Sequence, residues 1–283
     1  MNKEELKSSH TPPQYFVERG MVLGNQIVLT GGPLKHAKAQ RLREGEAFRA
    51  VLGDALYSAK VSEVLPDRIV AEIVGRTRLG EASWKVHLFA SLLKGQNFDL
   101  VVEKATEIGV TSIVPVVTSR TIPRLDPDKA AERRLRWQKI AKAASEQSGR
   151  GTAPVIGEVA SLTSLLEAAT SACGKDRVGH GPASDLEGIL TPVPGPTRDF
   201  VIPGVRLLAY EHQEMTVPLA GALRDVAETS VLVGPEGGLD SLEVETVLSS
   251  GFVPVSLGPY IMKAETASIA AVSLLVHYLS NRG

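Results

Sequence analysis

The sequence is poor in the residues that many kinds of active site need. It contains one cysteine, Cys173, so it cannot form a disulfide within the chain, and this fits a reducing compartment. The six histidines are scattered and form no cluster with metal-ligand spacing, so we expect no metal, and neither a zinc enzyme nor a cysteine nucleophile. The Gly-x-x-x-x-Gly-Lys-Ser/Thr pattern of P-loop nucleotidases is also missing.

Long apolar runs are missing as well. The longest, residues 267–279, is interrupted by polar residues such as Ser268 and His277, which favours a buried core helix over a membrane span. Residues 1–14 lack the apolar region of a signal peptide. We therefore expect a cytoplasmic protein that does not contact a membrane.

The formal net charge of −1 hides a split between the two halves of the chain. Residues 1–150 hold 24 Lys and Arg against 17 Asp and Glu, a net charge of +7. Residues 151–283 hold 7 against 15, a net charge of −8. Local charge steers a polyanion, so nucleic-acid contacts are expected in the first half. Random drift of surface charge is the plain alternative.

The pattern of apolar residues predicts two domains with a boundary near residue 80. Short strand-like segments from 26 to 74, separated by Gly and Pro turns, are typical of a small barrel or sandwich. Beyond the boundary, apolar strands alternate with helical segments, which predicts an α/β fold with a parallel sheet. Residues 1 to about 15 are expected to form a loose arm, and Gly/Pro-rich residues 173–203 a loop or insertion.

The expected elements follow from these patterns. Strands are expected at 26–30, 47–52, 55–65, 68–74, 85–93, 112–119, 155–159, 206–212, 230–233 and 254–257. Helices are expected at 99–110, 125–150 (opened by Asp126-Pro127), 161–170, 241–250 and 266–279, with a helical turn at 36–43.

Two strand-to-helix junctions near the C-terminus are the most informative feature. GPEGG, residues 234–238, follows the apolar strand VLV and precedes a helix for which Asp240 or Ser241 is the expected N-cap. LGPYIMKAETA, residues 257–267, precedes the last helix. Loops at such junctions bind small molecules in open α/β sheets, because loop amides and helix N-termini meet there. The two loops therefore predict one cofactor pocket.

The residues within these loops suggest what the pocket holds. Glycines let a backbone approach a ligand closely. Glu236 would repel a phosphate and suits a ribose hydroxyl or an adenine amine better. Ile261 and Met262 are expected to wrap an aromatic base, and Thr266 to cap the last helix beside Glu265. The alternatives are an ordinary tight turn, apolar core filler and a capping carboxylate.

The ordered set of motifs resembles the bacterial 16S ribosomal RNA uracil-N3 methyltransferases of the SPOUT superfamily. The resemblance covers nearly the whole C-terminal two-thirds and is carried by EKATEIGV (103–110), Pro115, Arg120, WQKI (137–140), 144–148 with Arg150, Pro154, GPEGG and the LG…ETA loop. His36, Arg41, Gly45 and the strands that follow resemble the family's N-terminal PUA-like barrel more loosely.

This resemblance implies a fold and an activity. The fold is a PUA-like RNA-binding β-barrel over 1–80 and a SPOUT domain over 81–283 whose chain is knotted into a trefoil, with a cofactor site at roughly 205–270. The activity is S-adenosylmethionine-dependent methylation of N3 of a decoding-centre uridine of 16S ribosomal RNA in the assembled 30S subunit, by a homodimer.

The resemblance also implies site residues. The cofactor-binding residues are Tyr210, Glu211, Val233, Gly234, Pro235, Glu236, Gly237, Gly238, Leu257, Gly258, Tyr260, Ile261, Met262, Ala264 and Thr266. The catalytic candidates are the cations Arg120, Arg150 and Lys263, which can offset charge on a deprotonated base, with Glu265 or Glu236 as general base. The RNA-binding candidates are His36, Arg41, Arg43, Arg133 and Arg134.

The chain departs from the family at four places. Tyr260 stands where the family usually has Arg, and Met262-Lys263 where it has Leu-Arg. Thr121 replaces Ser, and Ala39-Gln40 replace Val-Leu. The alternatives are a SPOUT methyltransferase acting on transfer RNA or another ribosomal site, and an RNA-binding assembly factor with a decayed cofactor pocket.

Overall fold

The computed structural model describes residues 11–80, 82–123, 125–171, 202–223 and 226–281. The chain divides into two compact units. The first contains the chain up to residue 81 together with 145–152, and the second contains 82–144 and 153–283. The sequence did not indicate that residues 145–152 join the first unit. The loop expected at 173–203 lies almost entirely outside the described residues.

The first unit is a six-stranded sheet in the order β1-β4-β5-β6-β3-β2, which is antiparallel except where β1 runs parallel to β4. Its elements are β1 (Gln14–Phe16), η2 (Arg19–Met21), β2 (Val22–Leu23), β3 (Gln26–Leu29), α1 (Gly31–Ala39), β4 (Ala47–Leu52), β5 (Ala55–Val64) and β6 (Ile69–Arg78). In β5, buried Tyr57, Ala59 and Val61 alternate with exposed residues, which is the period of a strand with one face in a core.

Two expectations for the first unit were wrong. Gln14–Phe16 forms a strand rather than part of a loose arm, because Tyr15 is fully buried in the core and Gln14 is only 2% exposed. The expected helical turn at 36–43 is a helix that begins earlier, at Gly31. The Gly-Gly-Pro segment resembled a turn, but proline is well tolerated in the first turn of a helix, and here it buries its ring with Leu34.

The second unit is a seven-stranded sheet in the order β10-β8-β7-β12-β11-β13, with β9 beside β8. Every pairing between strands of its described residues is parallel, so the expected α/β fold is confirmed. Its strands are β7 (Lys85–Ser91), β8 (Ser112–Val117), β9 (Val155–Ile156), β10 (Ala160–Ser161), β11 (Val205–Ala209), β12 (Glu228–Val233) and β13 (Val253–Val255). Its helices are α2 (Asn97–Ile108), α3 (Pro127–Ser148, whose last four residues belong to the first unit), α4 (Leu162–Ser171), η3 (Gln213–Met215), α5 (Leu219–Ala222), α6 (Ser241–Ser249) and α7 (Ala264–Ser280).

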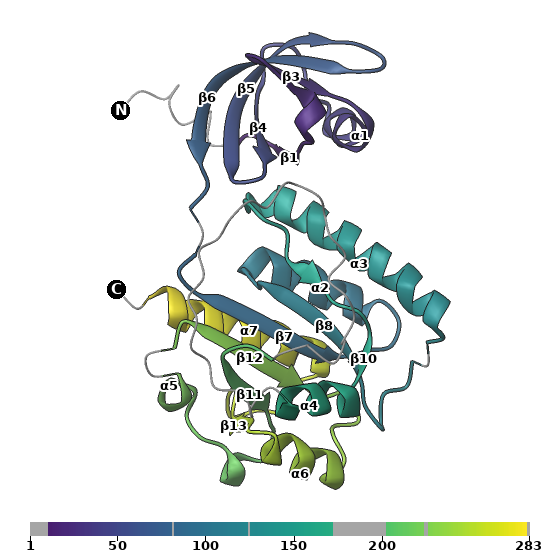
Figure 1. Ribbon diagram of the computed structural model, residues 1–283, viewed down its shortest axis with the longest axis vertical. Helices are drawn as coiled ribbons and strands as arrows, with labels where there is room; N and C mark the ends of the chain where they lie inside the picture. The colour runs from purple at the N-terminus through teal and green to yellow at the C-terminus, as the bar shows by residue number, and fades with distance from the viewer. Residues whose placement is uncertain (1–10, 81, 124, 172–201, 224–225, 282–283) are drawn as a thin grey trace. The chain divides into compact units, whose positions relative to one another are not determined.

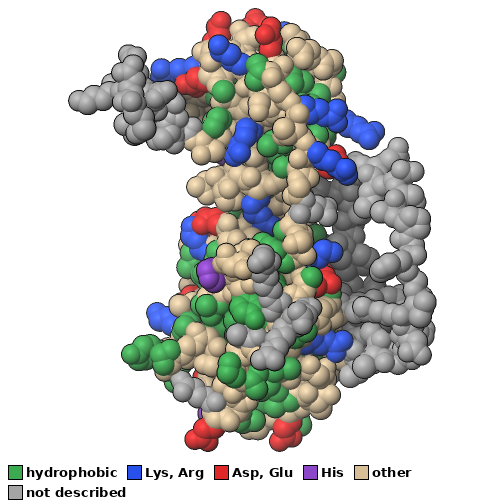
Figure 2. Space-filling view, turned by 90° about the vertical axis from the view of Figure 1, so that its left-hand side faces the viewer, with side chains coloured by type: hydrophobic (Ala, Val, Ile, Leu, Met, Phe, Trp, Pro, Cys, Tyr) green, Lys and Arg blue, Asp and Glu red, His purple; other side chains and the backbone are tan. Residues whose placement is uncertain are grey.

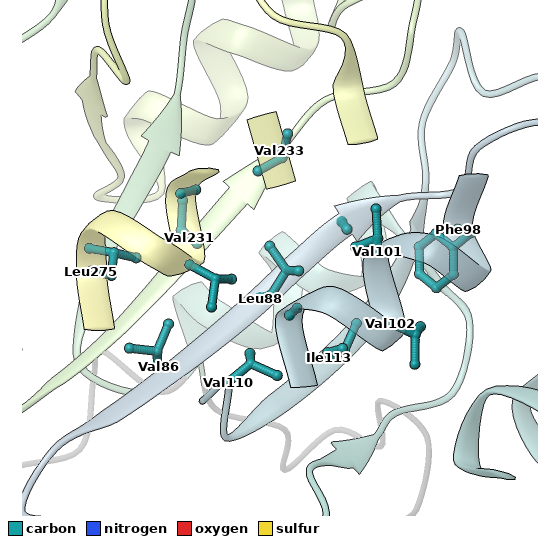
Figure 3. Close-up of a cluster of buried hydrophobic side chains, with 14 of the residues drawn as sticks. Val86, Leu88, Phe98, Val101, Val102, Val110, Ile113, Val231, Val233 and Leu275 are labelled. Atoms are coloured by element: carbon teal, nitrogen blue, oxygen red, sulfur yellow. The ribbon is translucent and has the colours of Figure 1, made fainter. Parts of the chain in front are cut away.

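Helices cover both faces of this sheet (Figure 1). Leu88 packs on the face covered by α2, α3 and α7, and its neighbour Phe89 packs on the face covered by α4 and α6. Figure 3 shows the first of these cores, where side chains of β7, β8, β12, α2 and α7 point toward one another. In the described part of the chain, no helix is both long enough and apolar enough to cross a bilayer.

The helix starts test three expectations. Asp240 is the N-cap of α6, and its side chain accepts a hydrogen bond from the Glu243 amide in a capping box, as expected. Asp126 likewise accepts a hydrogen bond from the Lys129 amide, 2.9 Å away, and α3 begins at Pro127. The expectation that Thr266 caps the last helix was wrong, because α7 begins two residues earlier with Lys263 at its N-cap.

At Gly204, directly before β11, the backbone passes very close to the start of β12. Its φ is +69°, and a Cβ added there would lie 2.0 Å from the carbonyl oxygen of Glu228. Gly204→Ala should therefore destabilise the protein by about 3 kcal/mol or more, because both the backbone conformation and the space exclude a side chain. Gly32→Ala is the control, since a Cβ there meets nothing within 4 Å and φ is not positive. Equal urea midpoints, followed by circular dichroism, for these two variants would contradict the prediction.

The surroundings of His87 predict that the second unit loses stability in acid. Its Nδ1 lies 2.7 Å from Ser112 Oγ and its Nε2 lies 3.1 Å from Glu228 Oε1, and burial lowers the pKa of the ring. The folded state thus favours the neutral ring, while the unfolded chain takes up a proton near the ordinary value of 6.5. Stability should be retained above that pH and should fall as the pH drops through it toward the lower folded-state pKa.

The control for this prediction is His87→Gln, which can keep polar contacts but cannot titrate. Between roughly pH 7.5 and 5.5, the melting temperature of the wild type should fall more than that of the variant. Parallel falls in the two proteins would show that His87 contributes nothing to the acid sensitivity.

Candidate functional site

A cleft of about 480 Å³ opens at the carboxyl edge of the sheet in the second unit. This volume lies within the range of small-molecule sites, roughly 300–1,000 Å³. The cleft is formed where β11, β12 and β13 end and where α7 begins, with one residue from the start of α2. Both predicted loops line it, so the expectation that they build one pocket is confirmed.

Most of the predicted cofactor residues lie in this cleft. The residues that line it are Asn97, Ala209, Tyr210, Glu211, Val233, Gly234, Pro235, Glu236, Gly238, Leu239, Ser256, Leu257, Gly258, Pro259, Tyr260, Ile261, Met262, Lys263, Ala264, Glu265 and Ala267. Gly237 and Thr266 were expected among them and are not. The Gly237 carbonyl oxygen instead accepts a hydrogen bond from Arg120, and Thr266 is exposed on α7.

The sequence missed several lining residues. Asn97 lies more than a hundred residues before the two loops, and nothing local to it indicates a binding role. Ala209 lies in the cleft because β11 lies between β12 and β13, in register with Val233 on one side and Val255 on the other. Its position directly before Tyr210 and Glu211, which were predicted to bind the cofactor, is a signal that could have identified it.

Glycine at position 258 fixes the shape of the second loop. Its φ of +150° is a backbone conformation that side-chain-bearing residues rarely adopt. Ser256 holds the same turn, because its Oγ donates to the Gly258 carbonyl at 3.0 Å and accepts from the Gly258 amide at 3.2 Å. The terminal carbon of Met262 would be only 3.7 Å from a Cβ at Gly258. That distance is an ordinary van der Waals contact, so the backbone conformation, and not a lack of space, favours glycine at this point.

The apolar residues of the second loop are not all enclosed. Tyr260 and Ile261 are 83% and 87% exposed, although both line the cleft. Ile261 was expected to enclose a base together with Met262, yet only Met262 is half-buried. Met262, Leu257 and Val233 therefore form an apolar wall of the cleft.

The carboxylates of the cleft differ in their surroundings. The Oε1 of Glu236 accepts a hydrogen bond from the Lys94 amide at 3.1 Å, so this side chain ties the GPEGG loop to the segment after β7. Glu211 is exposed. Glu265 is half-buried in the first turn of α7, and its Oε2 is fully buried with no hydrogen-bond partner among the described residues. This oxygen is therefore a hydrogen-bond acceptor that no described residue uses.

Ser119 and Arg120, which follow β8, hydrogen-bond to α6 and to the GPEGG loop. Arg120 Nη1 donates to the Gly237 carbonyl at 2.9 Å. The Ser119 amide donates to Glu243 Oε1 at 2.6 Å, and Ser119 Oγ donates to Asp240 Oδ2 at 2.7 Å. The Glu243 amide and then the Ser119 hydroxyl lower the pKa of Asp240 below its ordinary value. Arg120 contacts the loop without lining the cleft itself.

Four of the predicted residues, Arg150, His36, Arg41 and Arg43, belong to the first unit and not to the unit that contains the cleft. The Arg150 carbonyl accepts a hydrogen bond from Gln14 Nε2 at 2.6 Å, and burial lowers the pKa of its guanidinium. His36 Nδ1 lies 2.7 Å from Glu146 Oε2, and the same carboxylate accepts from the Phe16 amide. These hydrogen bonds join Arg150 and His36 to other residues of the first unit.

The other RNA-binding candidates divide by their exposure. Arg41, at a φ of +59°, and Arg43 are exposed in the segment after α1. Arg133 is half-buried, whereas Arg134 is 14% exposed and donates to the Ile156 carbonyl at 3.0 Å and to Glu158 at 3.5 Å. Figure 2 shows Lys and Arg as well as Asp and Glu side chains on the visible face of each unit, so each of these faces carries both signs.

Arg134 should act on stability rather than on RNA binding. Arg134→Ala removes a charged donor from the Ile156 carbonyl, which should cost about 1.5 kcal/mol or more of unfolding free energy. Arg133→Ala is the neighbouring control and should stay within about 0.5 kcal/mol of the wild type. Urea unfolding measures both. Equal stability of the two variants would return Arg134 to the set of RNA-binding candidates.

Comparison with known proteins agrees with this geometry. The chain matches the family described as RNA methyltransferase domain over residues 80–276. It is 27% identical over 250 residues to the Ribosomal RNA small subunit methyltransferase E of Bacillus subtilis, covering 87% of this chain and 88% of that relative. The protein of the same name from Aquifex aeolicus is 26% identical, with coverage of 90% and 96%.

Solved structures show the same fold. The Ribosomal RNA small subunit methyltransferase E from Neisseria gonorrhoeae, bound to S-adenosyl methionine, has a TM-score of 0.73 at 25% identity, covering 94% of this chain and 97% of that one. A Legionella pneumophila methyltransferase in complex with the same cofactor has a TM-score of 0.73 at 22% identity and equal coverage, and supports the fold alone. The matched residues 80–276 include both loops of the cleft, and as the sequence motifs indicated, the chain belongs to the RNA methyltransferase domain family.

Proposed function

We propose that the protein transfers a methyl group from S-adenosylmethionine to N3 of a uridine in 16S ribosomal RNA, acting on the assembled 30S subunit. The observation that carries the proposal is the single cleft that two glycine-containing loops form at the carboxyl edge of a parallel sheet. Relatives named as small-subunit ribosomal RNA methyltransferases, one of them solved with this cofactor, support it.

The residues of the cleft fit this cofactor. Gly234, Gly238 and Gly258 let the backbone approach an adenosine closely, and Met262 and Leu257 offer apolar surface to its base. The unpartnered Oε2 of Glu265 needs a hydrogen-bond donor, which the cofactor carries. When bound, the cofactor supplies a methyl group on a positively charged sulfur.

The remaining chemistry falls to the side chains of the chain. Uracil N3 carries a proton that must leave before or as the methyl group arrives, and the base then carries negative charge. Lys263 lines the cleft and is exposed, and Arg120 lies beside the GPEGG loop with its guanidinium exposed, so both can offset that charge. Glu236 is engaged by the Lys94 amide, but it remains exposed and is a candidate for the base.

The proposal also covers the role of the first unit and the oligomeric state of the protein. We propose that the first unit is a PUA-like domain that binds RNA through exposed basic residues such as Arg41 and Arg43. The unit, residues 1–81 with 145–152, holds 13 Lys and Arg against 11 Asp and Glu, a net charge of +2. We also propose, from the resemblance in sequence motifs, that the chain is knotted into a trefoil around the cleft and that the protein is a homodimer.

The activity is tested with purified 30S particles and naked 16S RNA from cells that lack the gene. The protein and labelled S-adenosylmethionine should label the particle, and mass spectrometry should place the methyl group on N3 of one uridine. Label only in transfer RNA or at another ribosomal base would establish a different target. Cofactor binding without label in any RNA would favour an assembly factor.

A variant of Arg120 distinguishes an effect on turnover from an effect on cofactor affinity. Arg120→Ala should lower turnover at least tenfold, about 1.4 kcal/mol of transition-state free energy, because a cation near the base is lost. The affinity for S-adenosylmethionine, measured by calorimetry, should change less than threefold, since Arg120 does not line the cleft. Arg120→Lys should recover part of the turnover. Equal losses in turnover and affinity would mean that Arg120 only holds the Gly237 carbonyl.

A further inference from the structure

The carboxylates that line the cleft are not equivalent. Glu236 accepts the Lys94 amide and Glu211 is exposed, so neither depends on a ligand for its hydrogen bonds. Glu265 differs, because its Oε2 is buried and no described residue donates to it. A buried carboxylate oxygen without a donor loses its hydration and gains nothing in return, which costs free energy. Glu265 thus combines an unused acceptor oxygen with a place in the lining of the cleft.

The position of Glu265 indicates the kind of donor. It lies in the first turn of α7, where the positive end of the helix favours a negative charge. Lys263, the charged residue nearest to it in sequence, is exposed, and among the ion pairs of the described residues none joins the two. A carboxylate with one buried oxygen and no protein cation beside it is matched by a ligand group that has both a positive charge and N–H bonds.

One group of the proposed cofactor meets both requirements. The sulfonium is charged but has no hydrogen to donate, and the adenine amine donates but is neutral. The α-ammonium of the methionine part is charged and donates. Resting on the proposed function, we propose that Glu265 binds this ammonium through Oε2 and so positions the methyl donor, rather than acting as the general base.

The test uses three ligands and isothermal calorimetry on the full chain. S-adenosylmethionine has the ammonium and the sulfonium, S-adenosylhomocysteine has the ammonium alone, and 5′-methylthioadenosine has neither. Glu265→Gln should weaken the first two about tenfold to hundredfold, the loss expected for one charge-assisted hydrogen bond. The affinity for 5′-methylthioadenosine should change less than twofold.

Matched variants control for charge and folding. Glu245→Gln makes the same chemical change at an exposed position of α6 outside the cleft, and should leave all three affinities unchanged. Glu265→Asp keeps the charge on a shorter side chain, and should recover part of the affinity for the two ammonium-bearing ligands. Circular dichroism and the melting temperature without ligand show whether the variants remain folded.

Each other outcome overturns the inference. Equal loss for all three ligands would place Glu265 against the adenosine, and loss for S-adenosylmethionine alone would place it against the sulfonium. Unchanged affinities with lost turnover would return it to the role of base. Failure of the folded wild type to bind any of the three would instead remove the proposed function itself, so the two failures are distinguishable.

Discussion

The parallel direction of every strand in the second unit is the constraint on which the cleft depends. Because the strands run the same way, each releases the chain at the same edge of the sheet. β11 lies between β12 and β13, with Leu208 in register with Leu232 and Pro254. The loops that follow β12 and β13 therefore start close together. A slip of one residue would turn the buried side chains to the wrong face and separate the loops, so register comes before any ligand contact.

Hydrogen bonds from neighbouring strands then hold the first loop in place. Glu236 is bound by the Lys94 amide after β7, and the Gly237 carbonyl is bound by Arg120 after β8. The capping box of Asp240 fixes the helix that follows. Three polar contacts from three segments thus define a loop that would otherwise have the freedom of its glycines. A loop that is already ordered loses less entropy when a ligand binds.

Much of this arrangement could be predicted from the sequence, and the failures share one cause. Strands, helices and the two loops follow from apolar periodicity and from glycine and proline, which are local signals. The strand at Gln14, the contribution of Asn97 to the cleft and the packing of residues 145–152 with the first unit depend on contacts distant in sequence. Arg134 resembled a phosphate-binding residue because its helix is basic, but its hydrogen bond to the Ile156 carbonyl is visible only in three dimensions.

The charges around the cleft suit two partners of opposite sign. Three carboxylates line it against a single ammonium, that of Lys263, so its lining is negative. A negative lining disfavours an RNA backbone but stabilises a cationic methyl donor. Two exposed cations lie beside these carboxylates: Lys263, which is itself part of the lining, and Arg120, which contacts the GPEGG loop from outside the cleft. Because the donor is cationic and the acceptor belongs to a polyanion, a site with one uniform sign would repel one of them.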